Sequence, residues 1–200
     1  MRDNGRKMTA IVLAAGLSSR MSALKPLLPI HGKPALYQVL DRIFNAGIEE
    51  CVVVSGHEFS RVEEAVKTYV QTQSRLVSIA HNPDYEKGMI TSVQAGIRFV
   101  IHQGGNDVLL HPVDIPLVAS QTIRAVAAAA EMEGHRNSFI VPCFQGRNGH
   151  PLFIPSSAFD SILRFEGEGG LRAIRDANPE TIVRIETDDE GCILDMDTPE

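Results

Sequence analysis

The chain has 200 residues, of which 44% are apolar and 22% are charged, and its formal net charge is −6. This length suits one medium-sized domain, and the acidic balance excludes a protein that coats nucleic acid with a broad basic face. No apolar run approaches the roughly 20 residues of a membrane span, the polar N-terminus lacks a signal-peptide pattern, and the three cysteines show no metal-ligand spacing. We therefore expect a cytoplasmic protein with reduced thiols and with neither nucleic acid nor a membrane as partner.

Short apolar runs alternate with amphipathic helical patterns over the first two thirds of the chain. The expected strands cover residues 11–13, 51–54, 76–80 and 108–110. The expected helices cover residues 36–44, 59–70, 90–101 and 120–130. This strict alternation predicts an α/β fold with a Rossmann-like, doubly wound, mostly parallel sheet and helices on both faces.

The last third of the chain follows a looser pattern. Residues 138–144 and 152–154 are predicted strands, residues 156–163 and 170–177 are predicted short helices, and residues 181–186 and 192–194 are predicted to pair as a hairpin. No repeat or linker interrupts the chain. We therefore predict a single domain over residues 1–200, with residues 1–8 as a flexible N-terminal tail and the last third as a small substrate-side elaboration.

The loop after the first strand carries the clearest functional signal. The strand 11–13 runs into a break at Ala14-Ala15-Gly16 and then into hydroxyl and cationic residues. No acidic side chain occurs between Asn4 and Leu40, whereas five cations lie there: Arg6, Lys7, Arg20, Lys25 and Lys33. In a chain of negative net charge this local excess of positive charge predicts a polyanion site.

Two common phosphate-binding motifs are absent from this loop. The sequence contains no G-x-x-x-x-G-K-[ST], which excludes a P-loop NTPase, and no G-x-G-x-x-G follows the first strand, which disfavours a dinucleotide cofactor.

A second loop follows the strand 108–110 and contains Asp114 between Pro112 and Pro116. Parallel α/β sheets bind ligands outside the carboxyl ends of their strands, so this loop and the loop after the first strand are expected to face one site. A rigid carboxylate near phosphates suits Mg²⁺, which prefers few carboxylates together with phosphate oxygens and water.

The motifs of this chain resemble those of the molybdenum cofactor cytidylyltransferase family, a group of molybdopterin nucleotidyltransferases with the NTP transferase fold. The first loop carries the resemblance, with Ser22 where the family usually has glycine. Further matching segments follow in order along the chain: Gly88-Met89-Ile90-Thr91-Ser92-Val93, Pro112-Val113-Asp114-Ile115-Pro116, Gly149-His150-Pro151, Gly167-Glu168-Gly169-Gly170-Leu171-Arg172 and Asp195-Met196-Asp197-Thr198-Pro199.

The resemblance implies a reaction in which CTP and a molybdopterin-type phosphomonoester give a cytidine dinucleotide cofactor and pyrophosphate. Ala15, commonly glycine in the guanylyl-transferring branch, favours cytidine. The implied cofactor is Mg²⁺, and the implied partners are CTP or another NTP, the molybdopterin substrate and a molybdenum hydroxylase that receives the product.

The resemblance also implies the residues of the site. The nucleotide side is expected to comprise Leu13, Ala14, Ala15, Gly16, Ser18, Ser19, Arg20, Lys25, Ser92 and Asp114. Arg20, Lys25 and Asp114 are the expected catalytic residues, because all the reacting groups are anionic and catalysis depends on positioning and charge neutralisation. The expected metal carboxylates are Asp114 with Asp195 or Asp197, which share a face if residues 193–197 form a strand. The expected acceptor side comprises His150, Gly169, Gly170 and Arg172.

Two alternatives stay open from the sequence. A guanylyltransferase, or an enzyme of the same fold that acts on a sugar or alditol phosphate, would carry the same loops. A non-catalytic protein that binds the nucleotide or delivers the molybdenum cofactor is the alternative from another class. That protein would be expected to have lost the metal carboxylate or the loop cations, and Asp114, Arg20 and Lys25 are all present.

Overall fold

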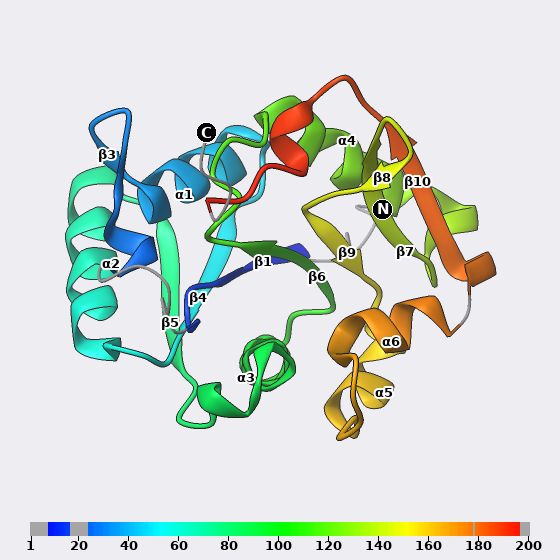
Figure 1. Cartoon of the computed structure of the whole chain (residues 1–200), viewed down its shortest axis with the longest axis horizontal. Helices are drawn as coiled ribbons and strands as arrows, with labels where there is room; N and C mark the ends of the chain where they lie inside the picture. Colours follow the sequence, from blue (N-terminus) through cyan, green and yellow to red (C-terminus); the bar gives the residue numbers. More distant parts are fainter. Residues whose placement is uncertain (1–7, 17–23, 178, 197–200) are drawn as a thin grey trace, which may run out of the picture.

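The computed structural model describes residues 8–16, 24–177 and 179–196. Its centre is an eight-stranded sheet in the order β10-β7-β9-β6-β1-β4-β5, with β8 paired to β7 (Figure 1). The strands of this sheet are β1 (Met8–Leu13), β4 (Glu50–Ser55), β5 (Leu76–His81), β6 (Asp107–Pro112), β7 (Phe139–Phe144), β8 (Arg147–Asn148), β9 (Leu152–Ile154) and β10 (Ile182–Glu186). A separate two-stranded ribbon pairs β2 (Pro29–Ile30) with β3 (Lys33–Pro34).

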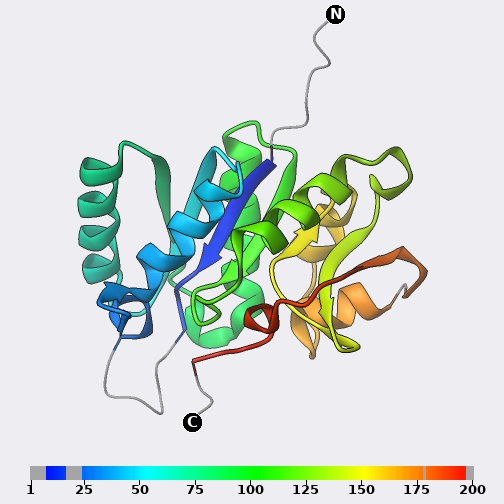
Figure 2. The same ribbon diagram turned by 90° about the horizontal axis from the view of Figure 1, so that it is seen from above.

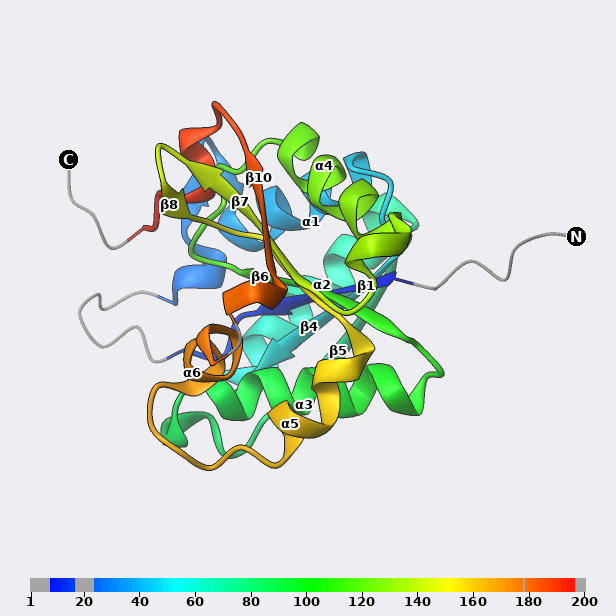
Figure 3. The same ribbon diagram turned by 90° about the vertical axis from the view of Figure 1, so that its right-hand side faces the viewer.

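Helices cover both faces of the sheet, as the alternation predicted. The helices are α1 (Ala35–Asn45), α2 (Phe59–Gln73), α3 (Met89–His102), α4 (Ser120–Glu131), α5 (Phe159–Leu163) and α6 (Gly170–Asp176). Helices α1, α2 and α4 pack in one hydrophobic cluster, and α3, α5 and α6 pack in the other on the opposite face (Figure 3). Among the described residues, no helix is long and apolar enough to cross a membrane.

The central strands are parallel and buried on both faces, which explains their continuous apolar sequence. β1 pairs in parallel with both β4 and β6, and β4 pairs in parallel with β5. β9 runs antiparallel between β6 and β7 because a tight turn at residues 145–146 folds the chain back after β7. The prediction of an α/β, mostly parallel sheet is confirmed.

The elements of the last third differ from the prediction at one place. The predicted hairpin of residues 181–186 and 192–194 is wrong, because β10 pairs in parallel with β7 and residues 190–192 form a 3-10 helix, η6 (Glu190–Cys192). The carboxylate of Asp189 accepts a hydrogen bond from the Gly191 N–H at 3.1 Å and turns the chain there. The segment after η6 therefore leaves β10 and runs toward the middle of the sheet (Figure 2).

At the N-terminal end, β1 begins at Met8, the last residue of the predicted tail, and residues 1–7 lie outside the described residues.

Candidate active site

The loops after β1 and β6 leave the sheet side by side. In the sheet register Leu13 lies opposite Pro112, so the two strands end at the same level. The Val113 N–H donates to the Leu13 carbonyl at 3.0 Å, and the Ala14 N–H donates to the Val54 carbonyl at 2.8 Å. The two loops that the sequence indicated therefore meet at the carboxyl edge of the sheet, the ligand-binding edge of this class of fold.

These loops border a cavity of about 320 Å³. Its other walls are the short 3-10 helices η1 (Lys25–Leu27) and η2 (Tyr85–Lys87) and the first turn of α3. Seven residues of the predicted nucleotide side line it: Leu13, Ala14, Ala15, Gly16, Lys25, Ser92 and Asp114. Ser18, Ser19 and Arg20, the remaining residues of that prediction, lie outside the described residues, as does Ser22.

An ion pair lies at the wall of the cavity. Lys25 Nζ lies 3.9 Å from Asp114 Oδ2, and the two side chains are 17% and 31% exposed. Both groups line the cavity, so a ligand placed there meets a cation and a carboxylate at once.

The Asp114 loop is held from beneath by His111, which is fully buried. Its Nε2 lies 2.8 Å from the carbonyl of Ile115, and because a carbonyl only accepts, Nε2 carries the proton. Burial lowers the pKa of His111 to about 4, so the ring is neutral near pH 7. His111 therefore has a structural role beneath this loop.

The start of α3 presents Ser92 to the cavity through a buried polar cluster. Ser92 is 4% exposed, and its Oγ accepts a hydrogen bond of 2.9 Å from Asn82 Nδ2. Asn82 is 3% exposed, donates also to Thr91 Oγ1 at 2.9 Å and accepts from the Asp84 N–H at 3.0 Å. Gly88 precedes the helix with φ +110°, a conformation that favours glycine.

Sequence reasoning did not identify Asn82 as a functional residue. The available signal was an asparagine directly after β5, at the same sheet edge as Asp114.

On the predicted acceptor side, the His150 ring lies perpendicular to the His111 ring with centroids 6.4 Å apart. Burial lowers the pKa of His150 to about 3, and His111 and Arg175 act in the same direction. Within the described part of the chain, His150 Nδ1 is buried without a hydrogen-bond partner. His150 is therefore a neutral imidazole with an unused ring nitrogen.

The predicted glycines of this side stand at the start of α6. Gly169 and Gly170 have φ values of +84° and +56°. A Cβ on Gly170 would lie 3.9 Å from the Ile90 side chain, so the start of α6 adjoins the start of α3.

The two arginines of α6 lie in different environments. The Arg172 side chain is 83% exposed and pairs with Asp176, with Nε and Oδ2 3.4 Å apart. The Arg175 side chain is only 16% exposed, and its charge contributes to the lowered pKa of His150. Of the two, Arg175 is thus the cation that acts on His150, and the sequence pattern singled out Arg172.

The segment that ends at Met196 reaches the Asp114 loop through a backbone contact. The Met196 N–H donates to the Asp114 carbonyl at 2.8 Å, which brings Asp195 to the Asp114 loop. Residues 193–196 do not form a strand, so the strand-based argument for Asp195 and Asp197 sharing a face does not apply. Asp195 is exposed, and Asp197 lies outside the described residues.

The carboxylate at this edge of the sheet suits a hard divalent cation. Within residues 8–16, 24–177 and 179–196, no group of three or more His, Cys, Asp or Glu side chains is arranged to hold a metal ion. Mg²⁺ fits a site with one or two carboxylates because it takes its other ligands from phosphate and water. Asp114, facing the cavity and adjoining the C-terminal segment, provides such a carboxylate.

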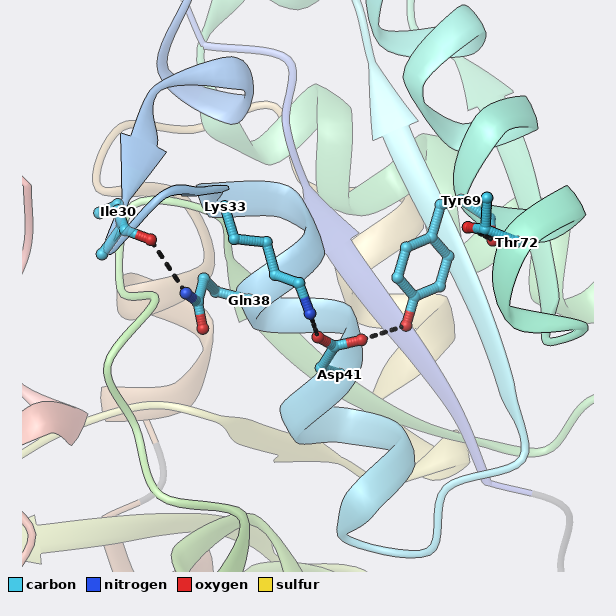
Figure 4. A network of polar contacts seen from close by, with 6 residues as sticks. All are labelled: Ile30, Lys33, Gln38, Asp41, Tyr69 and Thr72. Atoms are coloured by element: carbon cyan, nitrogen blue, oxygen red, sulfur yellow. Dashed lines mark hydrogen bonds and ion pairs between the residues drawn. The ribbon is translucent and has the colours of Figure 1, made fainter.

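Lys33, a member of the cationic N-terminal stretch, is not among the residues that line the cavity. Its Nζ is paired with the carboxylate of Asp41 on α1, which also accepts from Tyr69 Oη at 2.8 Å (Figure 4). Gln38 Nε2 donates to the Ile30 carbonyl at 3.0 Å in the same network. The network ties the β2–β3 ribbon to α1 and α2, so it supports the segment that follows Lys25.

Comparisons with known proteins agree with this geometry. The model of the MobA-like NTP transferase domain matches residues 10–182. The chain is 27% identical to the purine catabolism protein PucB of Bacillus subtilis over 96% of this chain and 93% of that protein. It is 28% identical to the molybdenum cofactor cytidylyltransferase of Escherichia coli over 95% of this chain and 91% of that enzyme.

Among solved structures, Rv0371c from Mycobacterium tuberculosis superposes with a TM-score of 0.75, at 24% identity and with 96% and 94% of the two chains covered. The manganese complex of that protein superposes with a TM-score of 0.65, at 21% identity and with the same coverage. These two likenesses show the fold alone.

Proposed function

The chain belongs to the MobA-like NTP transferase family and is a nucleotidyltransferase, and on this premise we propose that it transfers CMP from CTP to a molybdopterin-type phosphomonoester with release of pyrophosphate. The observation that carries the proposal is that the β1 loop, Lys25 and Asp114 meet at one cavity. The cytidylyltransferase among the relatives supports the choice of reaction.

The proposed chemistry joins two anions. A phosphate oxygen of the acceptor attacks the α-phosphorus of CTP, a new P–O bond forms, and the bond to the bridging oxygen breaks as pyrophosphate leaves. Because nucleophile, electrophile and leaving group are all negatively charged, catalysis depends on positioning and on charge neutralisation.

On the nucleotide side, the backbone from Ala14 to Ser18 is proposed to cradle the triphosphate, together with Leu13 and Ser19. Lys25 and Arg20 are proposed to neutralise charge that develops on the leaving pyrophosphate. Ser92 is proposed to contact the base or ribose, and Ala15 favours cytosine over guanine.

Asp114, with Asp195 or Asp197, is the proposed carboxylate set for Mg²⁺. When bound, that ion supplies charge neutralisation between the phosphates. Lys25 lies 3.9 Å from Asp114. This proximity supports the proposal that Lys25 neutralises the phosphates from the same side of the cavity as Asp114.

On the acceptor side, His150, Gly169, Gly170 and Arg172 are the proposed contacts. Burial lowers the pKa of His150 to about 3, so its ring is proposed to meet the substrate in the neutral form. The close approach of α6 to α3 at Gly170 brings this side next to the nucleotide pocket.

The test is pyrophosphate release with each of CTP, GTP, ATP and UTP, in the presence of Mg²⁺ and molybdopterin. We expect release with CTP and its loss in Asp114→Ala, with Asp188→Ala as a control that removes an equal charge from an exposed position. Release with GTP in place of CTP would overturn the cytidylyl assignment alone. A parallel reaction with sugar and alditol phosphates tests the acceptor.

Absence of turnover with every nucleotide and acceptor would overturn the catalytic proposal. Binding of the nucleotide or cofactor without turnover would then favour the delivery protein.

A further inference from the structure

The chain from Thr187 to Met196, here called the C-terminal strap, crosses from β10 to the Asp114 loop (Figure 1, red). The Thr187 N–H donates to the Cys143 carbonyl of β7 at 3.0 Å, and three further attachments join the strap to α4, to the turn at His150 and to the Asp114 loop. Of these parts, the Asp114 loop lines the cavity of the candidate active site.

The first attachment is Asp189 at the start of α4. Its Oδ2 accepts from the Ala119 N–H at 2.7 Å and from Thr122 Oγ1 at 2.6 Å. Ala119 is the N-cap residue of α4, and no cap side chain of its own helix bonds there. A carboxylate from 70 residues further along the chain therefore caps this helix, where the helix dipole favours negative charge.

The second attachment is Cys192, at the turn that carries His150. The Cys192 carbonyl accepts from the His150 N–H at 2.8 Å, and Cys192 is fully buried. A Cβ on Gly149 would lie 2.6 Å from the Cys192 carbonyl oxygen, so the two backbones touch with no room for a side chain.

The third attachment is Met196, whose N–H donates to the Asp114 carbonyl at 2.8 Å. The strap thus contacts the acceptor side at His150 and the nucleotide side at Asp114 within five residues of chain. Its path is set where it begins, since Asp189 also accepts from the Gly191 N–H at 3.1 Å and starts η6.

We propose that Asp189 is a positioning residue that sets the path of the C-terminal strap, and through it the relative placement of His150 and Asp114. The proposal rests on the proposed function, in which these two residues serve the acceptor and the metal. Asp189 itself contacts α4 and lies outside the residues that line the cavity, so it acts only through the strap. Supporting residues of this kind often change activity by about 10- to 100-fold.

The experiment compares Asp189→Ala with Asp188→Ala, which removes the same charge from the exposed neighbouring residue. Amide hydrogen exchange at His150 and Met196 reports on the strap itself and needs no substrate. Steady-state kinetics with CTP and the acceptor show whether a change in the strap alters catalysis. Thermal unfolding shows how much stability each variant loses.

We expect Asp189→Ala to speed exchange at both amides and to lower kcat about tenfold. KM for CTP should change less than about twofold, because the nucleotide pocket keeps its own contacts. Asp189→Asn, which retains one carbonyl oxygen as acceptor, should restore part of the protection and of kcat. If Asp189→Ala does not fold, Thr122→Val removes one of the three hydrogen bonds with little change in shape and is compared in the same way.

The proposal would be overturned if Asp189→Ala lost thermal stability but kept the amide protection and the kcat of Asp188→Ala. Asp189 would then be only a helix cap. Failure of the proposed function has a different outcome, because the wild-type protein would not turn over while the two amides would still respond to Asp189→Ala.

Discussion

Asn82 Nδ2 donates a 2.9 Å hydrogen bond to Ser92 Oγ at the wall of the candidate nucleotide pocket, and both side chains are buried. The described residues supply Ser92 Oγ with this one partner, so its hydroxyl proton is available to a ligand in the cavity. Asn82 thus orients the hydroxyl of a residue that lines the cavity.

We predict that Asn82→Ala raises KM for CTP about tenfold, because the Ser92 hydroxyl loses its orienting partner. Steady-state kinetics at varied CTP concentration measure this effect. Thr91→Val is the matched control, since it removes the other hydroxyl that Asn82 contacts and leaves Ser92 in place. Equal KM values in the two variants would contradict a specific role for the pair.

Lys25 and Lys33 provide a second matched comparison. Both belong to the cationic N-terminal stretch, but Lys25 lines the cavity and Lys33 is paired with Asp41 outside it. We predict that Lys25→Ala lowers kcat roughly 100-fold through lost charge neutralisation, and that Lys33→Ala changes kcat little. Pyrophosphate release at saturating CTP measures both. A large kcat loss in Lys33→Ala would show that net charge, rather than position, matters.

We predict that the two buried histidine rings make the protein less stable in mild acid. His111 has its pKa lowered to about 4 and His150 to about 3, so in the folded state both rings stay neutral while the unfolded chain takes up protons near pH 6.5. The free energy of unfolding should therefore fall as the pH drops from 6.5 toward 4, with up to about 3 kcal/mol from His111 alone.

Urea unfolding between pH 7 and pH 4 tests this dependence. His111→Gln keeps a donor for the Ile115 carbonyl but does not titrate, so it should flatten the slope. His102→Gln alters an exposed histidine and should leave the slope as in the wild type. Identical slopes in all three proteins would contradict the prediction.

The two arginines of α6 give a fourth prediction. Arg175 is largely buried near His150, and Arg172 is exposed beside Asp176. We predict that Arg175→Ala raises KM for the acceptor about tenfold and that Arg172→Ala raises it less. Kinetics at varied acceptor concentration and saturating CTP show which of the two variants has the higher KM for the acceptor. A larger effect in Arg172→Ala would favour the residue that the sequence motif indicated.

Local sequence determined most of the architecture of this protein. Apolar runs such as 11–13 and 108–110 indicated strands buried on both faces, and their alternation with helical patterns indicated the parallel sheet. The carboxyl-edge rule then placed Lys25 and Asp114 at one site, and they lie 3.9 Å apart. These inferences succeeded because periodicity and strand direction are properties of short segments.

Only the tertiary structure decided how the site is supported. Asp189 caps a helix 70 residues away in the sequence, Cys192 holds His150, and Asn82 orients Ser92. A polar side chain in a turn has the same local pattern whether it faces water or a distant backbone N–H. Its partner is set by the packing of the whole chain, so the sequence pointed to the loops of the site, and the fold alone determined which buried polar residues hold them in place.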